Sequence, residues 1–184
     1  MNPHGGELGL EAGTVRLVRY SPRWGALFEA EVRRLAQFLD AAGVALRLEH
    51  TGSTSVPGLC AKPIIDILAG LAREEDRRPA IAALQAAGFT HRGEQGIPGR
   101  DFFRRGVPRQ YHLHLAEAGG PFWRDHLDFR DWLRSNPGAA AAYGALKESL
   151  ASRFPRDREG YIAGKTAFVM ATLREARAGH SGAG

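Results

Sequence analysis

A turn rich in glycine and hydroxyl side chains, followed by a single carboxylate in an apolar run, is the part of the sequence best suited to chemistry. Gly52 lets the backbone approach a ligand closely. Ser53 and Ser55 offer hydroxyls in a segment whose backbone N–H groups can hold a phosphate, and Lys62 adds positive charge. Asp66 lies among apolar residues, where a lone carboxylate is costly unless it is paired or binds a metal. The residue types leave two interpretations open: a phosphate and metal site, or a structural turn beside an aspartate that bonds to backbone.

His112 and His114 are two residues apart in an alternating segment, so a strand would turn both rings to one face of a sheet. Paired imidazoles that face a carboxylate such as Asp66 can bind a transition metal, Zn²⁺ or Mn²⁺, or contact phosphate as imidazolium. The alternative is a half-exposed strand face without a ligand, with the apolar residues at the alternate positions in the core.

Arginines gather immediately before the histidine pair, at positions 100, 104, 105 and 109. Guanidinium groups suit bidentate phosphate binding, and Arg104 is the candidate we assign to phosphate. A solvated basic hairpin is the alternative. Lys165, in the last predicted helix, is expected to be a surface lysine whose stem lies along apolar neighbours.

Hydrophobic periodicity indicates the elements that must position these residues. It predicts helices over 22–41, 75–87, 122–135, 137–153 and 157–177. It predicts strands over 44–50, 64–70, 89–93, 101–106 and 110–116, the last two forming a hairpin around Gly106-Val107-Pro108. Strands packed under helices, followed by a helical block from about residue 121, predict an α+β (α/β) domain with a mixed sheet flanked by helices.

The string EHTGSTSVPGL (49–59) and the following KPIIDI (62–67) resemble the signature of the GrpB-like family, a branch of the DNA polymerase beta-like nucleotidyltransferase superfamily. Similar patterns follow in the arginine segment, the histidine segment and the helical stretches 122–135 and 157–177, so the resemblance covers roughly residues 15–175. It implies a nucleotidyltransferase-like fold in which a Gly-Ser pair opens a short helix and holds a triphosphate. A later strand carries Asp-x-Asp or Asp-x-Glu, which binds Mg²⁺.

Gly52 and Ser53 match the pair and Asp66 matches the first carboxylate, but Leu68 stands where the superfamily has the second. Two-metal phosphoryl transfer needs ligands for both ions, so Leu68 puts a standard Mg²⁺ site in doubt. The resemblance therefore implies a divalent metal, Mg²⁺ or Mn²⁺ and as an alternative Zn²⁺, held by Asp66 with His112 and His114.

The expected activity is transfer of a nucleotidyl group from a nucleoside triphosphate (NTP) to an acceptor that the sequence does not identify. The rival is a non-catalytic nucleotide-binding, partner or folding module with a degenerate metal site, since GrpB-like domains also occur fused to dephospho-CoA kinase. Metal-dependent hydrolysis through the histidine pair ranks third.

The formal net charge of +5 favours anionic partners, namely nucleotides or other phosphate-bearing small molecules. RNA is an alternative that no basic run supports. No apolar run approaches the roughly 18 residues of a membrane span. A single cysteine, Cys60, and no secretion signal indicate the cytoplasm. We expect one domain over 14–178 with loose tails at 1–13 and 179–184; the oligomeric state is not legible in the sequence.

Overall fold

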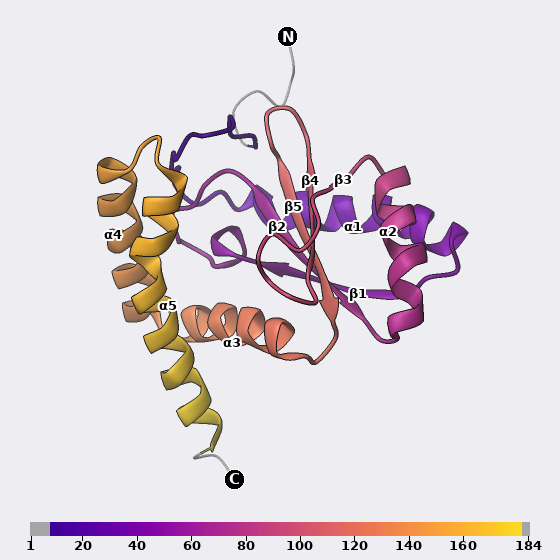
Figure 1. The fold of residues 1–184 in the computed structure, drawn as a ribbon. Coiled ribbons are helices and arrows are strands. Elements are labelled where there is room, and N and C mark those ends of the chain that lie inside the picture. The colour runs from indigo at the N-terminus through magenta and orange to yellow at the C-terminus, as the bar shows by residue number, and fades with distance from the viewer. Residues whose placement is uncertain (1–7, 182–184) are drawn as a thin grey trace.

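The computed structural model describes residues 8–181, and its elements follow the predicted order (Figure 1). The helices are α1 (Arg23–Ala41), α2 (Arg77–Ala86), α3 (Pro121–Ser135), α4 (Pro137–Arg153) and α5 (Arg158–Ser181). The strands are β1 (Leu46–Thr51), β2 (Ile65–Leu71), β3 (Thr90–His91), β4 (Asp101–Arg105) and β5 (Tyr111–Glu117). Single 3₁₀ turns cover Ser53–Ser55 and Glu74–Asp76.

The five strands form one mixed sheet in the order β1-β2-β5-β4-β3. β2 and β5 run parallel, while the pairs β1/β2, β4/β5 and β3/β4 are antiparallel. The predicted β4–β5 hairpin is confirmed, as are the mixed sheet and the helical block that follows it. The parallel pair matters most for the site, because it places Asp66 directly opposite His112 and Leu68 opposite His114.

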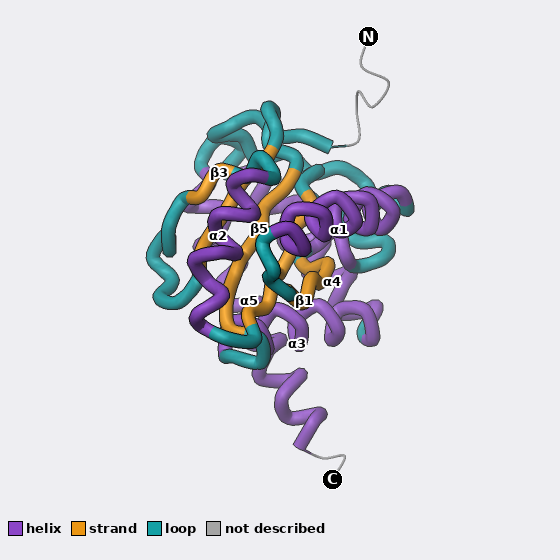
Figure 2. Tube along the Cα trace, turned by 90° about the vertical axis from the view of Figure 1, so that its right-hand side faces the viewer, coloured by secondary structure: helices purple, strands orange, loops and turns teal. Residues whose placement is uncertain are grey.

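The two faces of the sheet carry different side chains, as strand alternation requires. Ile67 on β2 and Leu113 on β5 have no exposed surface and pack with Trp24 and Leu35 of α1 in the main core. Helices α1 and α2 cover this face (Figure 2). The neighbouring positions on the same strands, Asp66 among them, therefore point to the opposite face.

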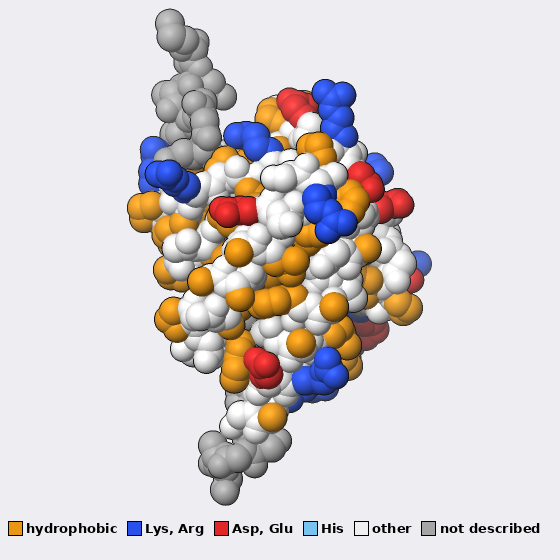
Figure 3. All heavy atoms as spheres, turned by 90° about the vertical axis from the view of Figure 1, so that its left-hand side faces the viewer, with side chains coloured by type: hydrophobic (Ala, Val, Ile, Leu, Met, Phe, Trp, Pro, Cys, Tyr) orange, Lys and Arg blue, Asp and Glu red, His pale blue; other side chains and the backbone are white. Residues whose placement is uncertain are grey.

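The helical block α3–α5 lies against that opposite face (Figure 1). The two come close at Gly70 of β2, where a Cβ atom would lie 2.6 Å from Cζ3 of Trp123 on α3. Val56, Leu59, Leu133 and Tyr143 join the turn after β1 to α3 and α4 in a second apolar cluster. The outer face of the block shows apolar side chains between scattered charges of both signs (Figure 3). None of the described helices is long and apolar enough to span a membrane.

The structure differs from the expected tails within the described residues. Leu10 is 3% exposed, and its backbone pairs with that of Arg109 just before β5, so residues 8–10 are packed where a loose tail was expected, while residues 11–13 are exposed. At the other end α5 continues to Ser181, beyond the predicted end at 177. Residues 1–7 and 182–184, which complete the two expected tails, lie outside the described part.

Candidate functional site

The turn after β1 brings the backbone against the side chain of Asp66. Thr51, the last residue of β1, pairs with Asp66 on β2, and the chain then reverses at Gly52, whose φ of 68° suits glycine. A Cβ atom at Gly52 would collide with Oδ2 of Asp66 and lie 3.0 Å from its Cγ. Ser53 then opens the short 3₁₀ helix. The predicted geometry, a Gly-Ser turn leading into a short helix beside the strand that carries Asp66, is confirmed.

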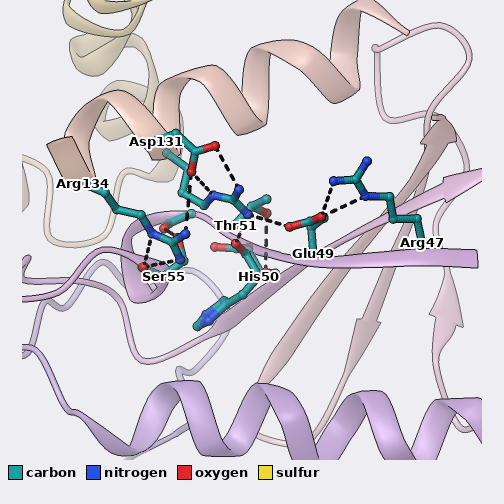
Figure 4. A network of polar contacts seen from close by, with 10 residues as sticks. Arg47, Glu49, His50, Thr51, Ser55, Asp131 and Arg134 are labelled. Carbon is teal, nitrogen blue, oxygen red and sulfur yellow. Dashed lines mark hydrogen bonds and ion pairs between the residues drawn. The ribbon is translucent and has the colours of Figure 1, made fainter. Parts of the chain in front are cut away.

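Two arginines of α3 hold this turn in place (Figure 4). Arg134 donates two hydrogen bonds to the carbonyl oxygen of Ser55, at 3.0 and 2.8 Å. Arg130 donates to the carbonyl oxygen of His50 at 3.1 Å and to Oε2 of Glu49 at 2.9 Å. These bonds fix the helical block to the end of β1, so the position of the turn depends on α3.

Asp66 and His112 form a polarised pair. Nδ1 of His112 lies 3.1 Å from Oδ1 of Asp66. Burial by itself would raise the pKa of Asp66, but the hydrogen bond and charge of His112, with the charges of His114 and Lys62, hold it at about 2. Asp66 is therefore ionised and accepts, so the proton of the neutral His112 ring lies on Nδ1. Nε2 of His112, which then carries a lone pair, is buried and has no hydrogen-bond partner among the described residues.

His114 and His126 are neutral rings with fixed partners. Burial lowers the pKa of His114 to about 3, against an opposing effect of Asp66. Nη1 of Arg100 donates to Nδ1 of His114 at 3.3 Å, which leaves the ring proton on Nε2. Nδ1 of His126 on α3 donates to the carbonyl oxygen of Phe122 at 2.8 Å. The three histidines thus offer different groups: a lone pair on His112 and His126, and an N–H on His114.

A cavity of about 480 Å³ opens over these groups, between the sheet and the helical block. Its volume is in the range of small-ligand sites. Asp66 is the one carboxylate among the described residues that line it. Its cationic lining residues come from the loop before β2, the segment before β4, α4 and α5: Lys62, Arg100, Lys147, Arg158 and Lys165. The cavity therefore carries a large excess of positive charge.

Lys147 connects this cavity to the Gly-Ser turn. It is 1% exposed, and Nζ donates to Oγ of Ser53 at 2.9 Å and to the carbonyl oxygen of Cys60. Burial lowers the pKa of Lys147 to about 8. Burial, with the charges of Lys62 and Lys147, lowers the pKa of Lys165 to about 7. Both pKa values are lowered mainly because burial disfavours the charged amine, and an anion that entered the cavity would favour the charged form of both.

Six of the eight residues assigned to the site from the sequence line this cavity: Gly52, Ser53, Lys62, Asp66, His112 and His114. Ser55 does not; its hydroxyl donates to the carbonyl oxygen of Gly52 at 2.6 Å and serves the turn. Arg104 does not line it either, because its guanidinium lies over the Phe102 ring, 5.2 Å from the centroid. The structure therefore does not bring these two residues into the cavity, and their assignment to phosphate stays a prediction.

Sequence reasoning missed the contributions of the helical block. Lys165 lines the cavity, where a surface lysine was expected, and Lys147, Arg158, Tyr143 and Tyr161 line it too. Tyr161 and Lys165 fall in a stretch that resembles the family, but Lys147, Arg158 and Tyr143 lie in helices whose pattern is that of ordinary packing. Only the three-dimensional position of α4 and α5 brings them to Asp66.

A divalent metal fits the side chains of this site poorly. Within residues 8–181, no group of three or more His, Cys, Asp and Glu side chains is placed to hold a metal ion. Asp66 is a single carboxylate, and Nε2 of His114 carries the ring proton, so His114 offers no lone pair beside the one on Nε2 of His112. Mg²⁺ requires several oxygen ligands in near-octahedral geometry. The metal site expected at Asp66, His112 and His114 stays a prediction.

We expect His50 and His114 to remain neutral well below the usual histidine pKa of 6.5. Burial lowers the pKa of His50 to about 4, as it lowers that of His114 to about 3. The unfolded chain binds both protons near pH 6.5 and the folded protein only near pH 4 and below. The free energy of unfolding should therefore fall as the pH drops through this window. NMR titration of the imidazole rings measures the two pKa values, and urea unfolding on both sides of the window measures the free energy of unfolding. A His50 or His114 ring that titrates near 6.5 would contradict the prediction.

Comparisons with known proteins identify the family of this chain. Residues 14–175 match the family described as GrpB protein. UPF0157 protein YqkA of Bacillus subtilis is 36% identical over 164 residues, which cover 89% of this chain and 47% of YqkA, so the chain spans about half the length of that relative.

Solved structures show the same fold. The conserved protein GrpB from Enterococcus faecalis is 37% identical, with a TM-score of 0.79 over 88% of this chain and 96% of that chain. Cid1 poly(U) polymerase, in a structure described as MgGTP bound, has a TM-score of 0.51 at 15% identity, over 73% of this chain and 44% of that chain. At that identity the likeness concerns the fold alone. The chain belongs to the GrpB family, and its fold is similar to that of nucleotidyltransferases.

Proposed function

We propose that this protein binds a nucleoside triphosphate in the cavity between the sheet and the helical block. The observation that carries the proposal is that five cationic side chains line the cavity that also holds the Gly52-Ser53 turn, with Asp66 as the one described carboxylate of the lining. Uncompensated positive charge inside a cavity is unfavourable in the free protein, and a polyphosphate is the anion that compensates it best.

The two ends of the cavity suit the two ends of such a ligand. Ser53 offers a hydroxyl that already accepts from Lys147, so an amine lies directly beside the turn. Ile97 and Ile162 also line the cavity and are 38% and 39% exposed, so they give the accessible part of the lining an apolar character. In this arrangement the phosphates rest near Ser53, and the nucleoside lies toward the isoleucines. The likeness in fold to a polymerase described as MgGTP bound supports a nucleotide as the ligand.

Calorimetric titration with a non-hydrolysable ATP analogue tests the proposal. We expect the analogue to bind and adenosine, which lacks phosphate, to bind far more weakly. Lys62→Met should lower the affinity about 10- to 100-fold, because losing a charged hydrogen-bond partner costs roughly 1.5–3 kcal/mol. Arg16→Met is the matched control, since it removes an exposed cation that does not line the cavity. Adenosine binding as tightly as the analogue, or an absence of binding with and without divalent metal, would overturn the proposal.

Nucleotidyl transfer is a second candidate, which the Asp66–His112 pair favours. Asp66 fixes the proton of His112 on Nδ1 and leaves Nε2 as an unpartnered base. In this reaction an acceptor hydroxyl attacks the α-phosphorus, the bond to the bridging oxygen breaks, pyrophosphate leaves, and Nε2 takes the hydroxyl proton. Release of pyrophosphate from labelled ATP that stops in His112→Gln, while the ATP affinity remains, would support transfer. Equal release by wild type and variant would remove His112 from the reaction.

A further inference from the structure

The lysines of this chain are confined to one place. The sequence has 25 Lys and Arg residues, of which only Lys62, Lys147 and Lys165 are lysines. All three line the cavity beside Asp66, although 103 positions separate the first from the last. The surface cations and structural ion pairs of the described residues use arginine throughout. A property of this cavity should therefore explain why lysine, and not arginine, occupies these three positions.

Lysine differs from arginine in carrying its charge as a compact point. An ammonium group can approach one phosphate oxygen closely from any direction, whereas a guanidinium needs a planar, forked contact. A divalent metal next to a triphosphate is also a compact point of positive charge. Three ammonium groups are thus the closest chemical equivalent of metal ions that the twenty side chains offer.

The three amines are held in place but are not neutralised. Nζ of Lys62 and Nζ of Lys165 lie over the Tyr161 ring, 5.4 and 4.6 Å from its centroid, and Nζ of Lys147 lies 4.8 Å from that of Tyr143. No described carboxylate forms an ion pair with any of the three lysines. Lys147 is buried and Lys62 and Lys165 are partly buried, and charges that lie without an ion-pair partner in a cavity are typical of a site that a ligand completes.

The carboxylates that a metal would need are missing from the same place. Leu68 occupies the position two residues after Asp66, where a second carboxylate would stand, and it has no exposed surface. The strand therefore lacks a second negatively charged ligand, while the helices and the loop that holds Lys62 contribute positively charged groups to the same cavity.

We propose that the ammonium groups of Lys62, Lys147 and Lys165 replace divalent metal ions in this cavity, so that it binds a polyphosphate anion without a metal. The ligand class is a nucleoside triphosphate or another compound with adjacent phosphates. This inference rests on the proposed function but goes beyond it, since a nucleotide site of this fold could equally require Mg²⁺.

Titration of ATP in EDTA and in excess Mg²⁺ tests the inference, with Asp66→Asn as the second arm. We expect ATP to bind in EDTA at least as tightly as in Mg²⁺, because the metal reduces the negative charge that the lysines meet. Asp66→Asn removes the negative charge nearest the amines, so the affinity in EDTA should stay the same or rise several-fold. Lys165→Met should lower it about 10- to 100-fold. Lys165→Arg, which keeps the charge but not the compact shape, should recover only part of the loss.

The outcomes separate the two proposals. Binding that appears only with Mg²⁺ or Mn²⁺ and is lost in Asp66→Asn would overturn metal-free binding and leave the proposed function intact. Binding in EDTA that all three single Lys→Met variants retain would also overturn it, since the amines would then carry no special role. An absence of ATP binding under every condition would overturn the proposed function and this inference with it.

Discussion

Gly52→Ala is expected to lower the free energy of unfolding by about 2–6 kcal/mol and to abolish nucleotide binding. The backbone at Gly52 has a φ of 68°, which costs a non-glycine residue about 1–3 kcal/mol. The added methyl group also collides with Oδ2 of Asp66, and overpacking of that kind costs about 1–3 kcal/mol more. Moving Asp66 aside would break its hydrogen bond with His112, so the site should fail with the turn. Urea unfolding and ATP titration measure the two effects.

Gly58→Ala is the matched control for this substitution. Gly58 has a similar φ of 78°, but a Cβ atom there meets nothing within 4 Å. The loss of unfolding free energy in Gly58→Ala therefore reflects backbone strain alone. The additional loss in Gly52→Ala measures the cost of the contact with Asp66. If Gly52→Ala destabilises the protein no more than Gly58→Ala does, the contact between the turn and Asp66 does not constrain the site.

The sequence predicted the sheet and the sheet-borne half of the site because both follow from short-range periodicity. Asp66 is conspicuous as one polar residue in an apolar strand, and the spacing of His112 and His114 fixes a common face once the segment is a strand. The backbone freedom of Gly52 and the hydroxyl of Ser53 can be inferred from the sequence without knowing which residues contact them. For these residues the fold had only to bring two adjacent strands together.

The other half of the site depends on packing that periodicity does not encode. The pattern of α5 shows that one of its faces is buried, but not which surface covers that face, so Lys165 was indistinguishable from a surface lysine. Ser55 does not line the cavity for a local reason: its hydroxyl donates to the carbonyl oxygen of Gly52 and closes the 3₁₀ turn. Arg104 lies opposite His112 on the correct face of the sheet, but its guanidinium stacks on Phe102 at the edge of the cavity.

Glu31→Ala should lower the free energy of unfolding by about 3 kcal/mol and leave the ATP affinity of the folded protein unchanged. Glu31 is 2% exposed on α1, where it accepts from Arg34 at 2.6 Å and pairs with Arg105 of β4. Removing one partner of a buried ion pair costs about 3–5 kcal/mol, and the partial exposure of Arg105 places the expected loss at the lower end. Urea unfolding measures this loss. Glu29→Ala, on the exposed face of the same helix, is the control.

The position of Glu31 makes this variant a test of how the sheet divides the molecule. Its partner Arg105 lies on the α1 side, 4.4 Å from the Tyr111 ring centroid, whereas Asp66 and His112 face the helical block. The double variant Glu31→Met with Arg105→Met should recover most of the lost stability, because apolar side chains of similar size can replace a buried pair. A loss within about 0.5 kcal/mol of the Glu29→Ala control would contradict the assigned role of Glu31. A fall in ATP affinity at full folding would show that the two faces are coupled through β4 and β5.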